Sequence, residues 1–246
     1  DRGDVPKANA LFEESLLLWR EVGDLKAVAR ALSNLANTVK LLGDYERSRA
    51  LYAECLSIFR GLGDRTGVGW SLNYQGDAAR DQGDFASARS LYERALAIFS
   101  ELTDRWGIAG TLADLGSLAR EQRDFSTAHS LYRESIKIFQ ELEHKRGIAR
   151  LLECFACSAA AQLDAERSLR LAGAAAALRQ NIGAPLTPTE RTKLEDILDA
   201  AREAMSNTAG TTAYLQGWAL PPEKAIEEVL MPEDFGWSQG TITGTS

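Results

Sequence analysis

GDFASARSLYERALAIF, at residues 83–99, is the stretch that decides the fold, because it recurs at a spacing of forty residues. The tightest other copies are GDYERSRALYAECLSIF at residues 43–59 and RDFSTAHSLYRESIKIF at residues 123–139, and GDVPKANALFEESLLLW at residues 3–19 is a looser copy. A fixed period of this size indicates an array of similar supersecondary units, each burying its apolar face only against its neighbours. Such an array is typical of a binding scaffold and not of a compact enzyme.

Each unit carries two helical patterns. Apolar residues recur three and four positions apart across residues 91–99 and again across residues 112–119, which predicts two amphipathic helices. We therefore expect an all-α chain, an α-solenoid of about four forty-residue helix pairs with a helical cap at its C-terminal end.

The turns between helices are marked by residues that suit them. Gly43 and Gly83 are suited to a left-handed residue at a helix end, and the aspartate that follows each can accept backbone N–H bonds at the start of the next helix. In the third copy Arg123 replaces the glycine and is followed by Asp124. We expect that turn to be the most strained of the three.

Composition and charge narrow the functional classes. The 246 residues are 45% hydrophobic and 26% charged, which suffices for a continuous core. The net charge of −7 disfavours nucleic-acid binding, which needs clustered basic residues. No apolar run approaches the length of a membrane span and no leader is recognisable. Three cysteines do not make a disulfide framework, so we expect a reducing, cytoplasmic location.

The residues around the Gly-Asp-aromatic turn resemble a tetratricopeptide repeat. Leu112, Leu115 and Gly116 match the large, Leu and Gly positions of its first helix, and the positions of its second helix are matched by Phe85, Ala88, Tyr92, Ala95 and Leu96. The units depart from the family pattern by lacking the helix-terminating proline, by having Gln75 and Phe155 in place of Leu, and by exceeding the common thirty-four residues by six. The resemblance covers roughly residues 3–181 and implies a long-helix form of the repeat.

The pattern divides the chain into three parts. Residues 1–181 are expected to form the superhelical array with an incomplete first unit, residues 182–231 a C-terminal helical cap, and residues 232–246 a flexible tail. Thr187, Pro188 and Glu190 form a capping box that predicts a helix over 188–206, and two shorter helices are expected over 208–218 and 222–230.

The closing segment carries a second resemblance. LRLAGAAAALRQNIGAPLTPTER at residues 169–191, YLQGWAL at 214–220 and EKAIEEVL at 223–230 are similar to the C-terminal end of the sensor arm in LuxR-like and related bacterial signal-transduction ATPases. This resemblance implies a nucleotide-binding switch domain before the repeats and an effector domain elsewhere in a parent chain. The first unit supplies only its second helix, so we expect the chain to be a fragment whose exposed helix could also pair with a second copy.

The sequence contains no recognisable catalytic or metal site. It has no G-x-x-x-x-G-K-[ST] loop, so we expect no ATP binding. Cys154 and Cys157 form a C-x-x-C, but the pair falls inside a predicted helix without further ligands. His129 and His144 fall at different phases of the repeat, and the sequence implies no nucleophile beside either of them. We expect a non-catalytic chain with no metal and no cofactor.

The candidate binding residues lie on the first helix of each pair, which lines the concave groove in the tetratricopeptide family. This mapping gives Arg30, Ser33, Asn34, Asn37, Lys40, Trp70, Asn73, Tyr74, Asp77, Arg80, Asp114, Ser117 and Arg120. Three side-chain amides, those of Asn34, Asn37 and Asn73, can pair with an extended peptide backbone, or they are ordinary solvated residues. Trp70 either anchors a ligand or fills the gap left by Gly67 and Gly69. Ser33 stands where the clamp of chaperone-binding relatives needs a lysine.

Three functional hypotheses follow. The first is a non-catalytic sensor and interaction domain of a bacterial signal-transduction ATPase or transcriptional regulator, in which a protein, peptide or small ligand in the groove changes the curvature of the array and releases the switch domain. The second is a free-standing adaptor with no ATPase attached. The third is a hydrolase or metal enzyme, which stoichiometric zinc in the purified protein would indicate.

Overall fold

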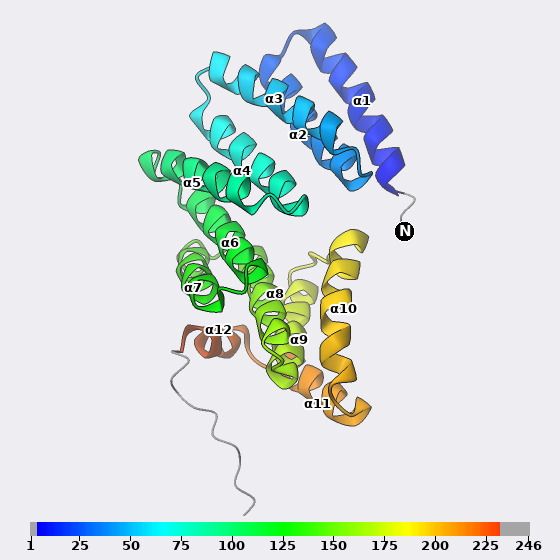
Figure 1. The fold of residues 1–246 in the computed structure, drawn as a ribbon, viewed down its shortest axis with the longest axis vertical. Coiled ribbons are helices and arrows are strands. Elements are labelled where there is room, and N and C mark those ends of the chain that lie inside the picture. Colours follow the sequence, from blue (N-terminus) through cyan, green and yellow to red (C-terminus); the bar gives the residue numbers. More distant parts are fainter. Residues whose placement is uncertain (1–3, 232–246) are drawn as a thin grey trace, which may run out of the picture.

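The computed structural model describes residues 4–231, and all regular secondary structure in that range is α-helical (Figure 1). The described helices are α1 (Asp4–Val22), α2 (Leu25–Leu41), α3 (Tyr45–Gly61), α4 (Arg65–Asp81), α5 (Phe85–Glu101), α6 (Arg105–Glu121), α7 (Phe125–Glu141), α8 (Lys145–Ala161), α9 (Ala165–Asn181), α10 (Pro188–Glu203), α11 (Asn207–Trp218) and α12 (Pro222–Leu230). The expected all-α solenoid of four helix pairs, α2/α3 to α8/α9, is confirmed. The flexible tail expected over 232–246 lies outside the described residues.

The forty-residue period contains a twenty-residue rhythm. Helices α2 to α9 are each 17 residues long. Each turn between consecutive helices from α1 to α9 contains one residue in the left-handed backbone conformation. In the earlier turns this residue is glycine, with φ of 79° at Gly23 and 88° at Gly43. Later turns place Thr103, Arg123, Glu143 and Leu163 in the same region, with φ between 51° and 65°. Arg123 is thus strained as expected, but so are three further turns.

Leu163 offers a test of this backbone strain. Its side chain is 91% exposed and its φ is 65°, so the residue contributes no burial while adopting a conformation that L-residues disfavour. We expect Leu163→Gly to raise the free energy of unfolding by about 0.5–1 kcal/mol, because relief of the strain exceeds the entropy cost of glycine. Urea denaturation checks this. The matched control is Leu142→Gly at an αR position with φ −83°, which should destabilise; equal effects of both changes would contradict the strain argument.

Side-chain caps fix where each helix begins. Asp44, Asp84 and Asp124 accept the backbone N–H three residues on, with O···N distances of 3.0, 3.1 and 3.0 Å, as the sequence predicts. At α8 the cap is His144, whose Nδ1 accepts the N–H of Gly147 at 3.1 Å. Each cap satisfies a backbone donor that the helix itself cannot satisfy.

In the second and third complete pairs the helices pack through a buried tyrosine against a glycine. Tyr92 and Tyr132 are fully buried. A Cβ built on Gly76 would lie 2.6 Å from the Tyr92 ring, and one on Gly116 would lie 2.6 Å from the Tyr132 ring. The glycine therefore lets α4 approach α5 and α6 approach α7, whereas in the pair α8/α9 Ala172 stands at the position of the tyrosine.

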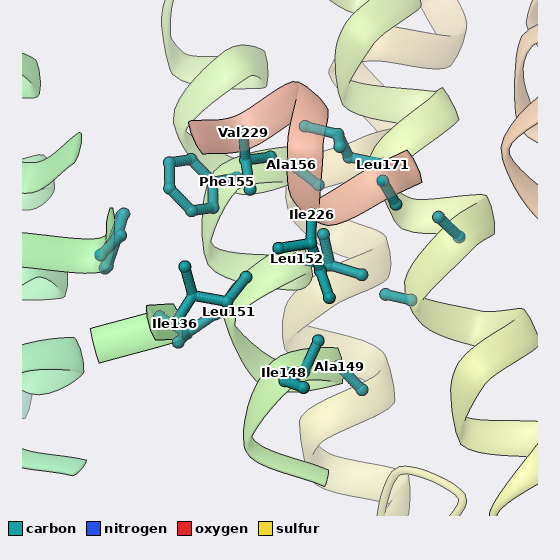
Figure 2. Close-up of a cluster of buried hydrophobic side chains, with 14 of the residues drawn as sticks. Ile136, Ile148, Ala149, Leu151, Leu152, Phe155, Ala156, Leu171, Ile226 and Val229 are labelled. Atoms are coloured by element: carbon teal, nitrogen blue, oxygen red, sulfur yellow. The ribbon is translucent and has the colours of Figure 1, made fainter. Parts of the chain in front are cut away.

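Helices α10, α11 and α12 cover the C-terminal end of the array. The capping box of Thr187 and Glu190 is present at α10, with Pro188 at its start. Figure 2 shows Ile226 and Val229 of α12 lying against Leu152 and Phe155 of α8 in the core. These contacts make the end of the array and the closing helices one continuous core.

Three hydrogen bonds from two arginines hold the end of α12 in place. Arg133 on α7 donates to the carbonyl oxygens of Val229 at 2.9 Å and Met231 at 2.8 Å. Arg170 on α9 donates to Glu228 at 2.7 Å.

None of the helices between residues 4 and 231 is long and apolar enough to span a membrane.

The opposite end of the described array leaves apolar side chains uncovered. These large exposed residues lie on α1 and are Leu11, Leu17, Leu18, Trp19 and Val22. In the four complete pairs the corresponding second helix is covered by the first helix of its own pair, as α5 is by α4.

Candidate functional site

The candidate residues all lie on α2, α4 and α6, and we call the surface of these three helices and of the equivalent helix α8 the inner face. Figure 1 shows α4, α6 and α8 following one another along the array. Residues forty apart in sequence occupy equivalent places on successive helices, so the inner face consists of rows. One row contains Arg30, Trp70, Gly110 and Arg150, and the other rows carry the remaining candidates.

One row is anchored by the buried tyrosines. The hydroxyl of Tyr52 donates to Asn37 at 2.7 Å and that of Tyr92 donates to Asp77 at 2.7 Å. The amide nitrogen of Asn37 donates to a backbone carbonyl of its own helix at 3.2 Å. The polar groups of Asn37 and Asp77 are thus used to satisfy buried hydroxyls, a packing role that the sequence pattern did not indicate.

A second set of candidates forms a buried polar chain across three helices. Asn73 on α4 donates to Asp114 on α6 at 2.8 Å and accepts from Thr111 at 2.9 Å. Asp114 also accepts from Arg150 on α8, and this charge raises the pKa of the Arg150 guanidinium. Asn73 is 1% exposed and Asp114 is 4% exposed. We therefore place both residues inside the array as links between repeats, and not on the accessible binding surface.

Ion pairs link the C-terminal ends of the same helices. Lys40 on α2 lies 2.9 Å from Asp81 on α4, and Arg80 lies 3.7 Å from Glu121 on α6. The next repeat has Ala161 at the position of the acid, so Arg120 reaches Glu121 of its own helix at 3.4 Å. The ion pairs of Lys40 and Arg80 thus connect neighbouring repeats. Arg120 makes no such connection, because its partner is on its own helix.

The carboxyl group of Asp77 on the inner face has a shifted pKa, from which we predict how its charge affects stability. Burial, reinforced by the charge of Asp114, raises the pKa of the Asp77 carboxyl above its ordinary range. A raised folded-state pKa means that ionised Asp77 opposes folding above that pKa. Asn37 stands at the equivalent position and accepts the same tyrosine bond.

Asp77→Asn should therefore raise the melting temperature at neutral pH by about 2–4 °C, which corresponds to about 1 kcal/mol. The gain should shrink as the pH falls through the raised pKa and vanish below the unfolded-state value of about 3.9. Thermal melts of both proteins, recorded at intervals of about half a pH unit from about pH 3 to 8, measure how this difference in melting temperature depends on pH. A constant difference across that range would contradict the titration argument.

The accessible part of the inner face is aromatic. The rings of Trp70 on α4 and Trp106 on α6 have centroids 4.5 Å apart, and Tyr74 lies 5.9 Å from Trp70. Trp106 is 46% exposed, whereas Trp70 and Tyr74 are half-buried. We call Trp70, Tyr74 and Trp106 the aromatic cluster.

Glycines explain why Trp70 lies there. A Cβ on Gly110 would approach the end of the Trp70 ring to 3.2 Å, so glycine leaves the room that this ring occupies. The spaces beside Gly67 and Gly69 are instead occupied by Phe59 and Phe99. Of the two alternatives for Trp70, the gap-filling one is therefore not what the structure shows.

Trp106 is the residue that the sequence pattern missed. It stands in the turn-like string TDRWG, and its equivalents in other repeats are Lys26, Thr66 and Arg146, so periodicity gives no signal. The signal that could have found it is its position four residues before Gly110, one helical turn away on the same face. Around the cluster, Arg30 and Asn34 on α2 are exposed, and the Arg150 side chain is 42% exposed.

The histidines and the cysteine pair have packing roles. His129 Nε2 lies 2.7 Å from Ser158 Oγ, a contact that the sequence did not suggest, but His129 is 3% exposed and Ser158 is fully buried. The C-x-x-C lies within α8 as predicted, and burial raises the pKa of the Cys157 thiol to about 12. A protonated, buried thiol is a poor nucleophile and a poor metal ligand.

The repeats of this chain match a known protein family. A family model described as tetratricopeptide repeat matches residues 1–61, 27–101 and 67–141, which together make up more than half of the chain. The chain belongs to the tetratricopeptide-repeat family. Proteins of this family are typically non-catalytic interaction scaffolds, and no enzyme family is indicated. A search of curated proteins finds no match to the sequence.

Among solved structures, this tetratricopeptide-repeat chain is similar to the crystal structure of BtubC (BKLC) from P. vanneervenii. The two share 20% sequence identity with a TM-score of 0.64, over 92% of this chain and 90% of the other. At this level of identity the likeness concerns the fold alone.

Proposed function

We propose that the inner face binds an extended protein segment through the aromatic cluster. The single observation that carries this proposal is that Trp70 and Trp106, on adjacent repeats, lie 4.5 Å apart with Trp106 46% exposed. Tryptophan at a protected surface position is the residue type most enriched among binding hot spots. The family's general role in protein binding agrees with this use.

The neighbours of the cluster define the chemistry of the segment. Arg30 and Arg150 belong to the same row as Trp70, one repeat before it and two after it. Asn34 is exposed on α2 and its amide can both donate to and accept from a peptide backbone. The ligand that fits these groups carries a large apolar or aromatic residue beside a carboxylate, with steering by the guanidinium of Arg30, since that of Arg150 is already paired with Asp114.

The wider context of this binding is the sensor arm of a bacterial signal-transduction ATPase or transcriptional regulator in the cytoplasm. The resemblance of residues 169–191 and 214–230 to the end of such arms supports it. In this proposal, residues 1–181 form the sensing array and residues 182–231 its cap, and a ligand alters the curvature of the array and thereby a switch domain. A free-standing adaptor uses the same face and differs only in what the reading frame encodes before Asp1. A phosphate-binding loop encoded there supports the ATPase context, whereas a start codon within one helix length supports the adaptor.

A displayed library of random twelve-residue peptides tests the binding face. We expect selection on the protein to enrich peptides with Trp, Phe or Leu next to Asp or Glu, and we expect their affinity to fall at least tenfold, about 1.4 kcal/mol, in the double variant Trp70→Ala, Trp106→Ala. Trp218→Ala, on α11 away from the inner face, is the matched control and should retain full affinity. Selected peptides that bind the double variant as well as the parent would contradict the proposal.

A further inference from the structure

A cavity between the last repeat and the closing helices has no role in peptide binding on the aromatic cluster. It has a volume of about 420 Å³ and lies among α9, α10, α11 and the segment that joins α9 to α10. Figure 1 shows α10 running alongside α9, with α11 at its lower end. The volume falls within the range of about 300–1,000 Å³ that is usual for small-molecule sites.

Two of the cavity walls are apolar. One is a face of α9 with small side chains, and the other is a face of α10 with large ones. Helix α9 presents Ala172 and Ala176, one turn apart, from a run of small residues. Helix α10 presents Leu194 and Leu198, also one turn apart, and Trp218 of α11 adds an indole ring. Because α9 has no large side chain at these positions, the space between the helices is not filled.

A fixed guanidinium, that of Arg179, is part of the cavity lining. Arg179 donates through Nε and Nη2 to the two carboxylate oxygens of Glu153 at 2.5 and 2.8 Å, and through Nη1 to the carbonyl of Ala184 at 3.3 Å. The side chains of Arg179 and Glu153 are 9% and 12% exposed. Arginine has five N–H donors, and these bonds use three of them. The remaining two are held in position and can donate to a ligand oxygen.

The charges around the cavity favour an anion. Its lining contains three arginines, at 179, 191 and 202, and two glutamates, at 153 and 195. Glu153 is fully engaged by Arg179, and the exposed Arg191 at the rim makes no ion pair with any described residue. Arg202 pairs with Asp199 at 2.6 Å, so the cationic groups open to a ligand are Arg191 and the two unused donors of Arg179.

We propose that this cavity binds a small organic anion with an apolar body, of the class of medium-chain or aromatic monocarboxylates. The carboxylate is placed at Arg191 and the free donors of Arg179, and the apolar body lies between the alanines of α9 and the leucines of α10. The volume suits a molecule of about a dozen non-hydrogen atoms. Such a ligand bridges the array and its closing helices, independently of peptide binding on the inner face.

Decanoate, with decanol as its uncharged counterpart, tests the proposal on the full chain. We expect decanoate to bind saturably, to change the fluorescence of Trp218 at the cavity wall, and to bind at least tenfold more tightly than decanol, as measured by calorimetry. Arg191→Glu should weaken decanoate binding about tenfold with little effect on decanol. Arg60→Glu, an exposed arginine on α3, is its matched control and should change neither.

A second variant tests the location. Ala176→Phe should fill the cavity and weaken decanoate binding at least tenfold, whereas Ala200→Phe, exposed on α10 and outside the cavity lining, should have no effect. Absence of saturable decanoate binding, equal affinity for decanol, or unchanged affinity in Arg191→Glu would each overturn the proposal. Because Arg191 is on the surface, this last result is informative even where Ala176→Phe fails to fold.

Discussion

Replacing Gly217 by alanine is expected to detach the closing helices from the array. Helices α9 and α11 cross so closely that a Cβ on Gly217 would lie 1.8 Å from the carbonyl oxygen of Arg170, and one on Gly173 would lie 2.1 Å from that of Tyr214. The opposing atoms are backbone and cannot move aside without separating the helices. We expect the free energy of unfolding to fall by about 3–5 kcal/mol, which is among the largest effects that a single substitution has.

Guanidinium denaturation monitored by circular dichroism measures this loss, and hydrogen exchange locates it. Exchange should accelerate first in α10, α11 and α12 and remain slow in α4 and α5. The control is Gly61→Ala in α3, where a Cβ meets nothing within 4 Å. That change should stabilise slightly, by about 0.5–1 kcal/mol, because alanine is the better helix former. A Gly217→Ala protein that denatures like the parent would show that the crossing is not as tight as described.

Enlarging Gly116 to leucine is expected to split the array within its third complete pair, between α6 and α7. A Cβ on Gly116 already lies 2.6 Å from the ring of Tyr132 and 3.2 Å from the carbonyl oxygen of Ala128, and leucine adds three further carbons. Tyr132 is fully buried between α6, α7 and α8, so its ring has no free space to enter. Overpacking of this kind costs about 1–3 kcal/mol in ordinary cores, and a rigid helix contact raises the cost beyond that.

Because each repeat contacts only its neighbours, local damage should divide the unfolding into two transitions. Hydrogen exchange of Gly116→Leu should show loss of protection centred on α6 and α7. Gly116→Ala is the conservative control, since the equivalent positions in the first and last pairs are Ala36 and Ala156. Alanine should cost markedly less than leucine, and a single, undisturbed transition in the leucine variant would contradict the argument.

The repeat itself was predictable because periodicity and capping are local properties. The apolar spacing indicated the helix pairs, and Gly43 with Asp44 marked a turn that the structure contains. The twenty-residue rhythm was less evident, since Thr103 and Leu163 replace glycine at equivalent turns. Physical strain is tolerated there because the flanking helices fix the backbone.

The binding face was predictable only in outline. Periodicity placed Asn73 and Asp114 on the correct helices, but their burial depends on the distance between repeats, which no single helix pattern contains. Trp106 has no counterpart at its position in other repeats, and its contact with Trp70 arises between adjacent helices. The cavity was unpredictable for a similar reason, since it arises where the alanines of α9 face the leucines of α10.

The measurement that tests the binding face most directly is the nuclear magnetic resonance spectrum of the tryptophan indole N–H groups during titration with a selected peptide. The chain has five tryptophans, each giving one indole signal that substitution can assign. We predict that the signals of Trp70 and Trp106 shift together and saturate, while those of Trp19 and Trp218 stay in place. A peptide that binds without shifting the first two signals, or that shifts Trp218 instead, would contradict the assignment of the inner face as the protein-binding surface.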